Sequence, residues 1–132
     1  MTALLAGVHQ WLGYLVVLAV LVVAGMAFSR AKDAREFTPG LYVVAMVLVD
    51  VQVLLGIIIY LISAAWEAPL AIAVLHPVLG LLALAVGHVA VRRSRSEQMV
   101  VAAHRKAGRG LVVVFVLLVA NVVIATAPGL IS

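Results

Sequence analysis

Residues 41–63 read LYVVAMVLVDVQVLLGIIIYLIS, an apolar run interrupted by a single charged side chain, Asp50. About 20 consecutive apolar residues are enough for an α-helix to cross the hydrocarbon core of a bilayer. The run therefore predicts a membrane-spanning helix.

Three further apolar runs of similar length, residues 4–28, 69–91 and 106–127, predict three more spans. Of the 132 residues, 67% are hydrophobic and only 11% are charged, whereas soluble domains are roughly 45–50% apolar. The segments between the runs are short and polar, so no extramembrane domain remains to carry a nucleic-acid site. We expect an all-α integral membrane protein, a single four-transmembrane-helix bundle over residues 1–132.

The basic side chains are confined to one end of this expected bundle. The N-terminus, the link around Trp66 and the C-terminus contain none of them. All nine lie in or beside the first and third links: Arg30, Lys32, Arg35, Arg92, Arg93, Arg95, Arg105, Lys106 and Arg109. By the positive-inside rule the two basic links face the cytoplasm and both termini face outward. The expected location is the plasma membrane of a prokaryote, in which the chain is multi-pass.

Two histidines begin similar phrases, His9-Gln-Trp-Leu-Gly13 and His76-Pro-Val-Leu-Gly80. Each lies about six residues into a span that runs inward, roughly 9 Å from its outer end, so the two rings can meet at one level. Because a histidine inside a membrane is costly, it is a functional-site candidate. We predict that His9 and His76 ligate one haem B from its two faces, and that Gly13 and Gly80 let the porphyrin approach the backbone. The alternative is that both histidines only join neighbouring helices.

The other two histidines suggest a second, inner haem as an alternative. His88 lies near the cytoplasmic end of the third run, and His104 lies in the basic segment before the fourth. A histidine at the membrane surface is readily solvated and needs no metal, so we expect His104 to be solvated.

The second run contains a polar pair, Asp50 and Gln52, at about the middle of the membrane. A carboxyl group there is expected to be protonated, hydrogen-bonded or part of a proton path. Asp50 is therefore a candidate for bonding a histidine or for taking a proton from a quinone. The alternative is that it joins helices through Asn121 or Tyr60.

The run Val51-Gln-Val-Leu-Leu-Gly56, followed by Ala73-Val-Leu-His76 in the next span, resembles one half of the haem A synthase family. The resemblance implies a four-helix haem-binding bundle in which His9 and His76 occupy the positions of the family's ligands. The chain departs from the family at Ala6 and Gln10, where the family has a catalytic glutamate and an arginine, and it lacks the paired loop cysteines. These departures argue against synthase activity.

The function expected from the sequence is that of a b-type cytochrome-like electron carrier rather than an enzyme. With both axial positions filled by imidazoles, no iron site is open to substrate. We expect lateral helix contacts with other membrane subunits, as in an accessory subunit of a respiratory or photosynthetic complex. Two alternatives stay open: a haem-handling enzyme or assembly factor related to haem A synthase, and a structural membrane subunit without a cofactor.

Overall fold

A computed structural model describes residues 1–127 and confirms four long helices, each apolar enough to cross a membrane. They are α1 (Thr2–Lys32), α2 (Gly40–Ile62), α3 (His76–Arg95) and α4 (Val100–Thr126). A short 3₁₀ turn, η1 (Ala65–Glu67), and a π-helical turn, η2 (Ala71–Leu75), connect α2 to α3. The span that contains α3 therefore starts at Ala71. The expected outward position of the C-terminus concerns residues 128–132, which lie outside the described part.

Three helices extend beyond the predicted membrane spans at the basic end. α1 continues to Lys32, α3 continues to Arg95, and α4 already begins at Val100. Alanine, lysine and arginine are good helix formers, so these ends stay helical after the apolar run has stopped.

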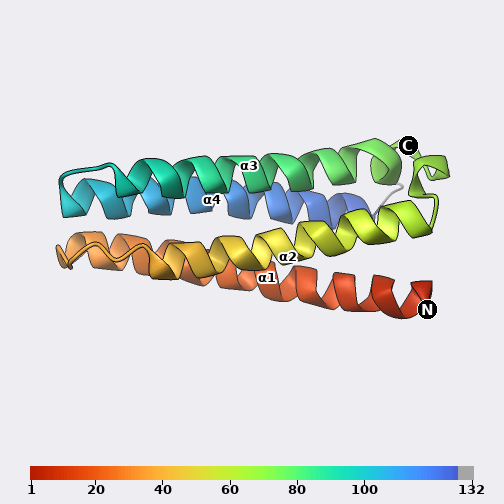
Figure 1. The fold of residues 1–132 in the computed structure, drawn as a ribbon, viewed down its shortest axis with the longest axis horizontal. Helices are drawn as coiled ribbons and strands as arrows, with labels where there is room; N and C mark the ends of the chain where they lie inside the picture. Colours follow the sequence, from red (N-terminus) through yellow and green to blue (C-terminus); the bar gives the residue numbers. More distant parts are fainter. Residues whose placement is uncertain (128–132) are drawn as a thin grey trace.

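The four helices run antiparallel to one another in chain order (Figure 1). α4 packs along both α1 and α3, while α2 contacts α1 and α3 on the other side. α1 and α3 are consequently diagonal partners across the bundle interior. The α1–α2 and α3–α4 links lie at one end, and the N-terminus lies at the opposite end with the α2–α3 link. All nine lysines and arginines are thus in the half nearer the two basic links.

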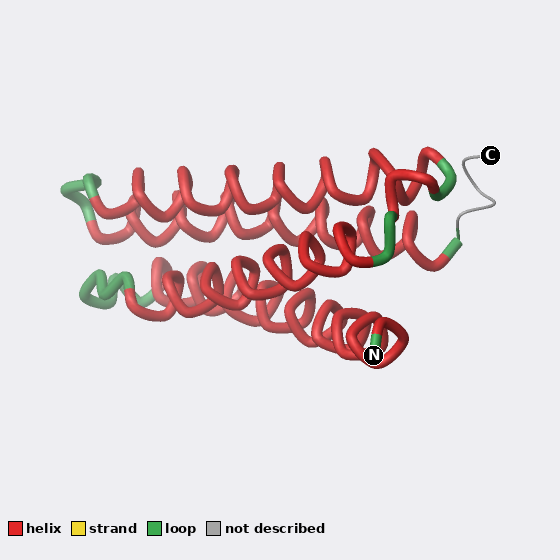
Figure 2. Tube along the Cα trace, turned by 45° about the vertical axis from the view of Figure 1, so that its right-hand side comes forward, coloured by secondary structure: helices red, strands yellow, loops and turns green. Residues whose placement is uncertain are grey.

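The tight packing of α1 and α2 is concentrated in that basic half. The buried residues of α1 run from Val16 to Ala31, and those of α2 run from Tyr42 to Val49. Many are alanine or valine, whose small side chains let helices approach closely. Toward the other end α1 and α2 diverge, and both Figure 1 and Figure 2 show this. The bundle is therefore closed at its basic end and open inside at the end that holds His9 and His76.

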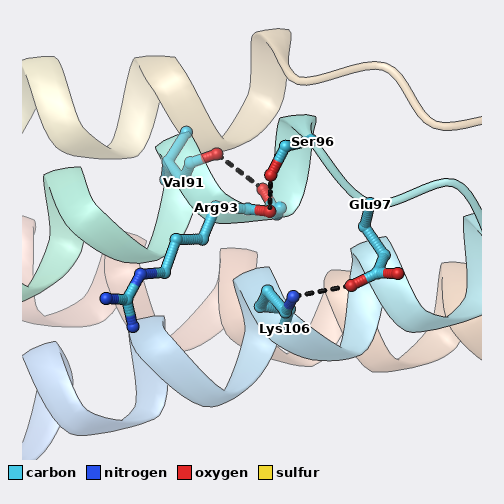
Figure 3. A network of polar contacts seen from close by, with 6 residues as sticks. Val91, Arg93, Ser96, Glu97 and Lys106 are labelled. Carbon is cyan, nitrogen blue, oxygen red and sulfur yellow. Dashed lines mark hydrogen bonds and ion pairs between the residues drawn. The ribbon is translucent and has the colours of Figure 1, made fainter.

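A polar turn connects α3 to α4 at the basic end (Figure 3). The Ser96 hydroxyl donates to the carbonyl of Arg93 at 3.0 Å, and Lys106 pairs with Glu97 at 2.6 Å. The hydrogen bond from Lys106, and then its positive charge, lower the pKa of the Glu97 carboxyl below its usual value. The pair thus favours the folded turn above the usual glutamate pKa, and this contribution is lost as the pH falls through the lowered value.

Candidate functional site

A cavity of about 820 Å³ fills the open half of the bundle. All four helices line it, and its walls include His9, Gly13, Gln52, His76 and Gly80. Cofactor sites of proteins are mostly apolar hollows of roughly 300–1,000 Å³ with a few polar groups. The cavity has the size and composition of such a site.

The two histidines predicted from matched depth meet in this cavity. The ring centroids of His9 and His76 are 6.0 Å apart, and the ring planes are inclined at 77°. The two rings meet in a T-shaped, edge-to-face arrangement. Two imidazoles on one metal ion, with bonds of about 2.0–2.1 Å, have centroids roughly 6 Å apart, so the separation of the rings, though not this mutual orientation, matches shared ligation. The diagonal position of α1 and α3 is what lets these side chains approach from opposite sides.

His9 is held from α2. The Gln52 side-chain amide donates to the carbonyl oxygen of His9 at 2.9 Å, and its nitrogen also lies 3.5 Å from Nε2 of the His9 ring. A Cβ at position 13 would lie 2.9 Å from that amide nitrogen, and a Cβ at position 56 would lie 3.0 Å from Cε1 of His9. Gly13 therefore gives room to Gln52, and Gly56 gives room to the His9 ring.

His76 is held from α4 and α2. Its Nδ1–H faces the carbonyl oxygen of Asn121 at 3.4 Å, an arrangement that directs Nε2 toward a metal in many metal-binding histidines. Pro77 has no N–H to donate to the carbonyl of Ala73, four residues earlier. The Tyr60 hydroxyl donates to that carbonyl at 3.0 Å instead. The π-helical turn and Tyr60 together stabilise the irregular backbone that presents His76.

Three buried polar atoms at this cavity have no hydrogen-bond partner in the described residues: Nδ1 of His9, Oε1 of Gln52 and Oδ1 of Asn121. An unpartnered buried polar group costs about 1–3 kcal/mol. In lipid, where water is absent, such groups need a partner even more. The three residues that carry these atoms all line the cavity.

The side chains of Asp50 and Gln52 lie on different sides of α2, although the two residues are only two positions apart. Two residues correspond to about 200° of helix rotation, so the side chains leave α2 in nearly opposite directions. Gln52 lines the cavity, whereas Asp50 accepts a hydrogen bond from Nε2 of His88 at 2.7 Å. Asp50 thus bonds a histidine, as one hypothesis proposed, but not one of the paired histidines. The two alternative partners proposed for Asp50 bond other groups: the Tyr60 hydroxyl donates to the carbonyl of Ala73, and the carbonyl of Asn121 faces His76.

His104 is fully buried, so the expectation that it is solvated at the surface is wrong. Its Nε2–H donates to the carbonyl of Arg35 at 3.0 Å, and its Nδ1 accepts from the Tyr42 hydroxyl. The ring of Phe37 lies against it. The segment between α1 and α2, which contains Arg35, lies against α4, and the hydrogen bond from His104 holds it there. The sequence alone does not predict this contact. Both ring nitrogens of His104 are thereby occupied, and His88 has a different partner, Asp50.

Sequence reasoning assigned no site role to three residues of this region: Gly56, Tyr60 and Asn121. Each had a signal. For Gly56 it is the spacing of one helical turn from Gln52, and for Asn121 it is a polar residue within an apolar run. For Tyr60 it is only a polar group within an apolar run, and its bond to Ala73 appears in the structure alone. What the sequence lacked was the rotation of each helix, which decides what these side chains meet.

The comparisons with family models, curated proteins and solved structures found no match to this chain. The relation to the haem A synthase family therefore stays a prediction. Among residues 1–127, no group of three or more histidine, cysteine, aspartate or glutamate side chains lies together as a metal site.

Proposed function

We propose that this protein is a membrane-embedded b-type haem protein that binds one haem through His9 and His76. The observation that carries the proposal is the 6.0 Å separation of the two rings across a cavity of about 820 Å³. The unpartnered atoms of His9, Gln52 and Asn121 support it, because they indicate a site that needs a further partner. A haem held there would supply one-electron redox chemistry.

The chain's own residues would position the group and exclude water. Gln52 and the Asn121 carbonyl orient the two rings, and the apolar walls keep the site in a medium of low polarity. Such outer partners and burial are the means by which proteins tune a haem's potential. None of the nine lysines and arginines lines the cavity, so carboxylates of the ligand would have to be solvated at the outer end of the cavity, near Gln10 and Thr126.

We place the protein in the plasma membrane of a prokaryote with its basic links in the cytoplasm, and the cavity near the outer leaflet. Its role would be electron transfer beside other membrane subunits, with a quinone as one candidate redox partner. Asp50 lies outside the cavity lining, so a quinone at that residue would approach from the lipid rather than from the haem site.

Oxidised and reduced absorption spectra of the purified protein, expressed with ample haem, test the proposal. We expect a low-spin bis-histidine spectrum that disappears in His9→Ala and in His76→Ala. His88→Gln is the matched control, since His88 lies outside the cavity lining and its substitution should leave the spectrum unchanged.

Each other outcome favours a different function. A chemically altered haem extracted from the protein would favour the haem-handling enzyme. Protein without any Soret absorbance would favour a structural subunit. A normal spectrum in either histidine-to-alanine variant would show that the ligand assignment is wrong.

A further inference from the structure

The hydrogen-bonded pair of Asp50 and His88 lies on the outside of the bundle. Asp50 comes from α2 and His88 from α3, and their side chains are 39% and 51% exposed. Both residues belong to membrane-spanning segments. The exposed side of this pair therefore faces lipid unless another protein covers it.

The surroundings make this pair an isolated polar spot. Val47 and Leu54, which are three and four residues from Asp50 and so share its side of α2, are 49% and 59% exposed. On α3, Ala85 is exposed one turn before His88. Ionisable side chains in membrane spans almost always face protein or a water-filled cavity, because hydrocarbon cannot solvate them. An acid and an imidazole amid exposed apolar side chains thus indicate a covered surface.

The hydrogen-bonding capacity of the pair is only partly used. The bond between them joins Nε2 of His88 to Oδ1 of Asp50. Among the described residues, the structure shows no further hydrogen bond from either side chain. A pair without net charge, which hydrocarbon favours, has a proton on Nδ1 of His88 whichever of Nε2 and Oδ1 holds the proton between them. Nδ1–H of His88 and Oδ2 of Asp50 are therefore left, a donor and an acceptor side by side in a medium without water.

We propose that this α2–α3 surface is where a second copy of the chain binds. A two-fold axis normal to the membrane places the same patch on both sides of the contact. The unused donor of each His88 then meets the unused acceptor of the other copy's Asp50, so a surface with one of each is complementary to itself. Packing of Val47 and Leu54 around the four polar side chains excludes lipid from them. This inference does not depend on haem binding.

Cysteine cross-linking in native membranes tests the contact, and the chain is suited to it because it contains no cysteine. We compare Leu54→Cys, beside the pair, with Val116→Cys on α4, which is 57% exposed and lies diagonally across the bundle from α2. The expected result under mild oxidation is a species of twice the chain mass for Leu54→Cys and none for Val116→Cys.

A second variant tests the role of the polar pair. Adding Asp50→Leu and His88→Leu to Leu54→Cys should lower the cross-linked fraction about tenfold, since hydrogen bonds between helices stabilise their association in membranes. Circular dichroism should show unchanged helicity. Equal cross-linking at both cysteine positions, no cross-linked species, or a product of another mass would each overturn the proposal, and the last would identify a different subunit as the partner.

Discussion

Gly56 shows how one missing side chain shapes the cavity. A Cβ at this position would lie 3.0 Å from Cε1 of His9, closer than most such contacts. A larger side chain would push the His9 ring out of its place opposite His76. We predict that Gly56→Leu lowers haem affinity about 10–100-fold, the range seen when a ligand's supporting shell is disturbed. Haem titration followed by Soret absorbance measures the effect.

Gly25 provides the matched control for this substitution. It lies in α1, and a Cβ there would meet nothing within 4 Å. Gly25→Leu therefore makes the same chemical change in a helix without touching the cavity, and we expect haem affinity to stay the same. Equal affinities of the two variants would show that the His9 ring does not depend on the space beside Gly56.

At the scale of elements, the entry into α3 depends on a hydrogen bond from another helix. Pro77 cannot donate to Ala73, and Tyr60 of α2 does so instead. We predict that Tyr60→Phe lowers the free energy of unfolding by about 0.5–1.5 kcal/mol, because the carbonyl then loses its donor. Unfolding of the protein in mixed detergent micelles, followed by circular dichroism, measures this change.

A double-mutant cycle with Pro77 tests whether Tyr60 acts by replacing the missing backbone donor. Pro77→Ala returns an N–H to the position four residues after Ala73, where it can donate to the same carbonyl. In that background Tyr60→Phe should have a much smaller effect, so the two substitutions should not be additive. Additive effects would mean that Tyr60 stabilises the protein by some other contact.

The existence of the four helices was predictable, because it depends only on the requirement that each segment cross the lipid bilayer. Every membrane span must satisfy its own backbone and present apolar side chains, so the four helices follow from run length. Matched depth also predicted that His9 and His76 approach each other. The partners of Asp50 and His104 were not predictable in this way. They depend on the rotation of α2 about its axis and on the segment after α1 folding back, and both are set by packing between helices that are distant in sequence.

The molecule as a whole is asymmetric along its long axis. One half contains all nine basic residues and the tightly packed core, and the other half contains the cavity with His9 and His76. The charge asymmetry predicts the orientation in a membrane, because lysine and arginine are generally retained on the cytoplasmic side. The position of the cavity in the membrane follows from this orientation and needs no contribution from the site residues.

We predict that the α2–α3 link is exposed to the outside and the α1–α2 link to the cytoplasm. Single cysteines at Trp66 and at Thr38, tested in intact cells with a membrane-impermeant maleimide, measure this. The Trp66→Cys variant should be labelled directly, and the Thr38→Cys variant only after the cells are broken. The reverse pattern would place the cavity near the cytoplasmic leaflet, where a haem at His9 and His76 would exchange electrons with partners on the opposite side of the membrane.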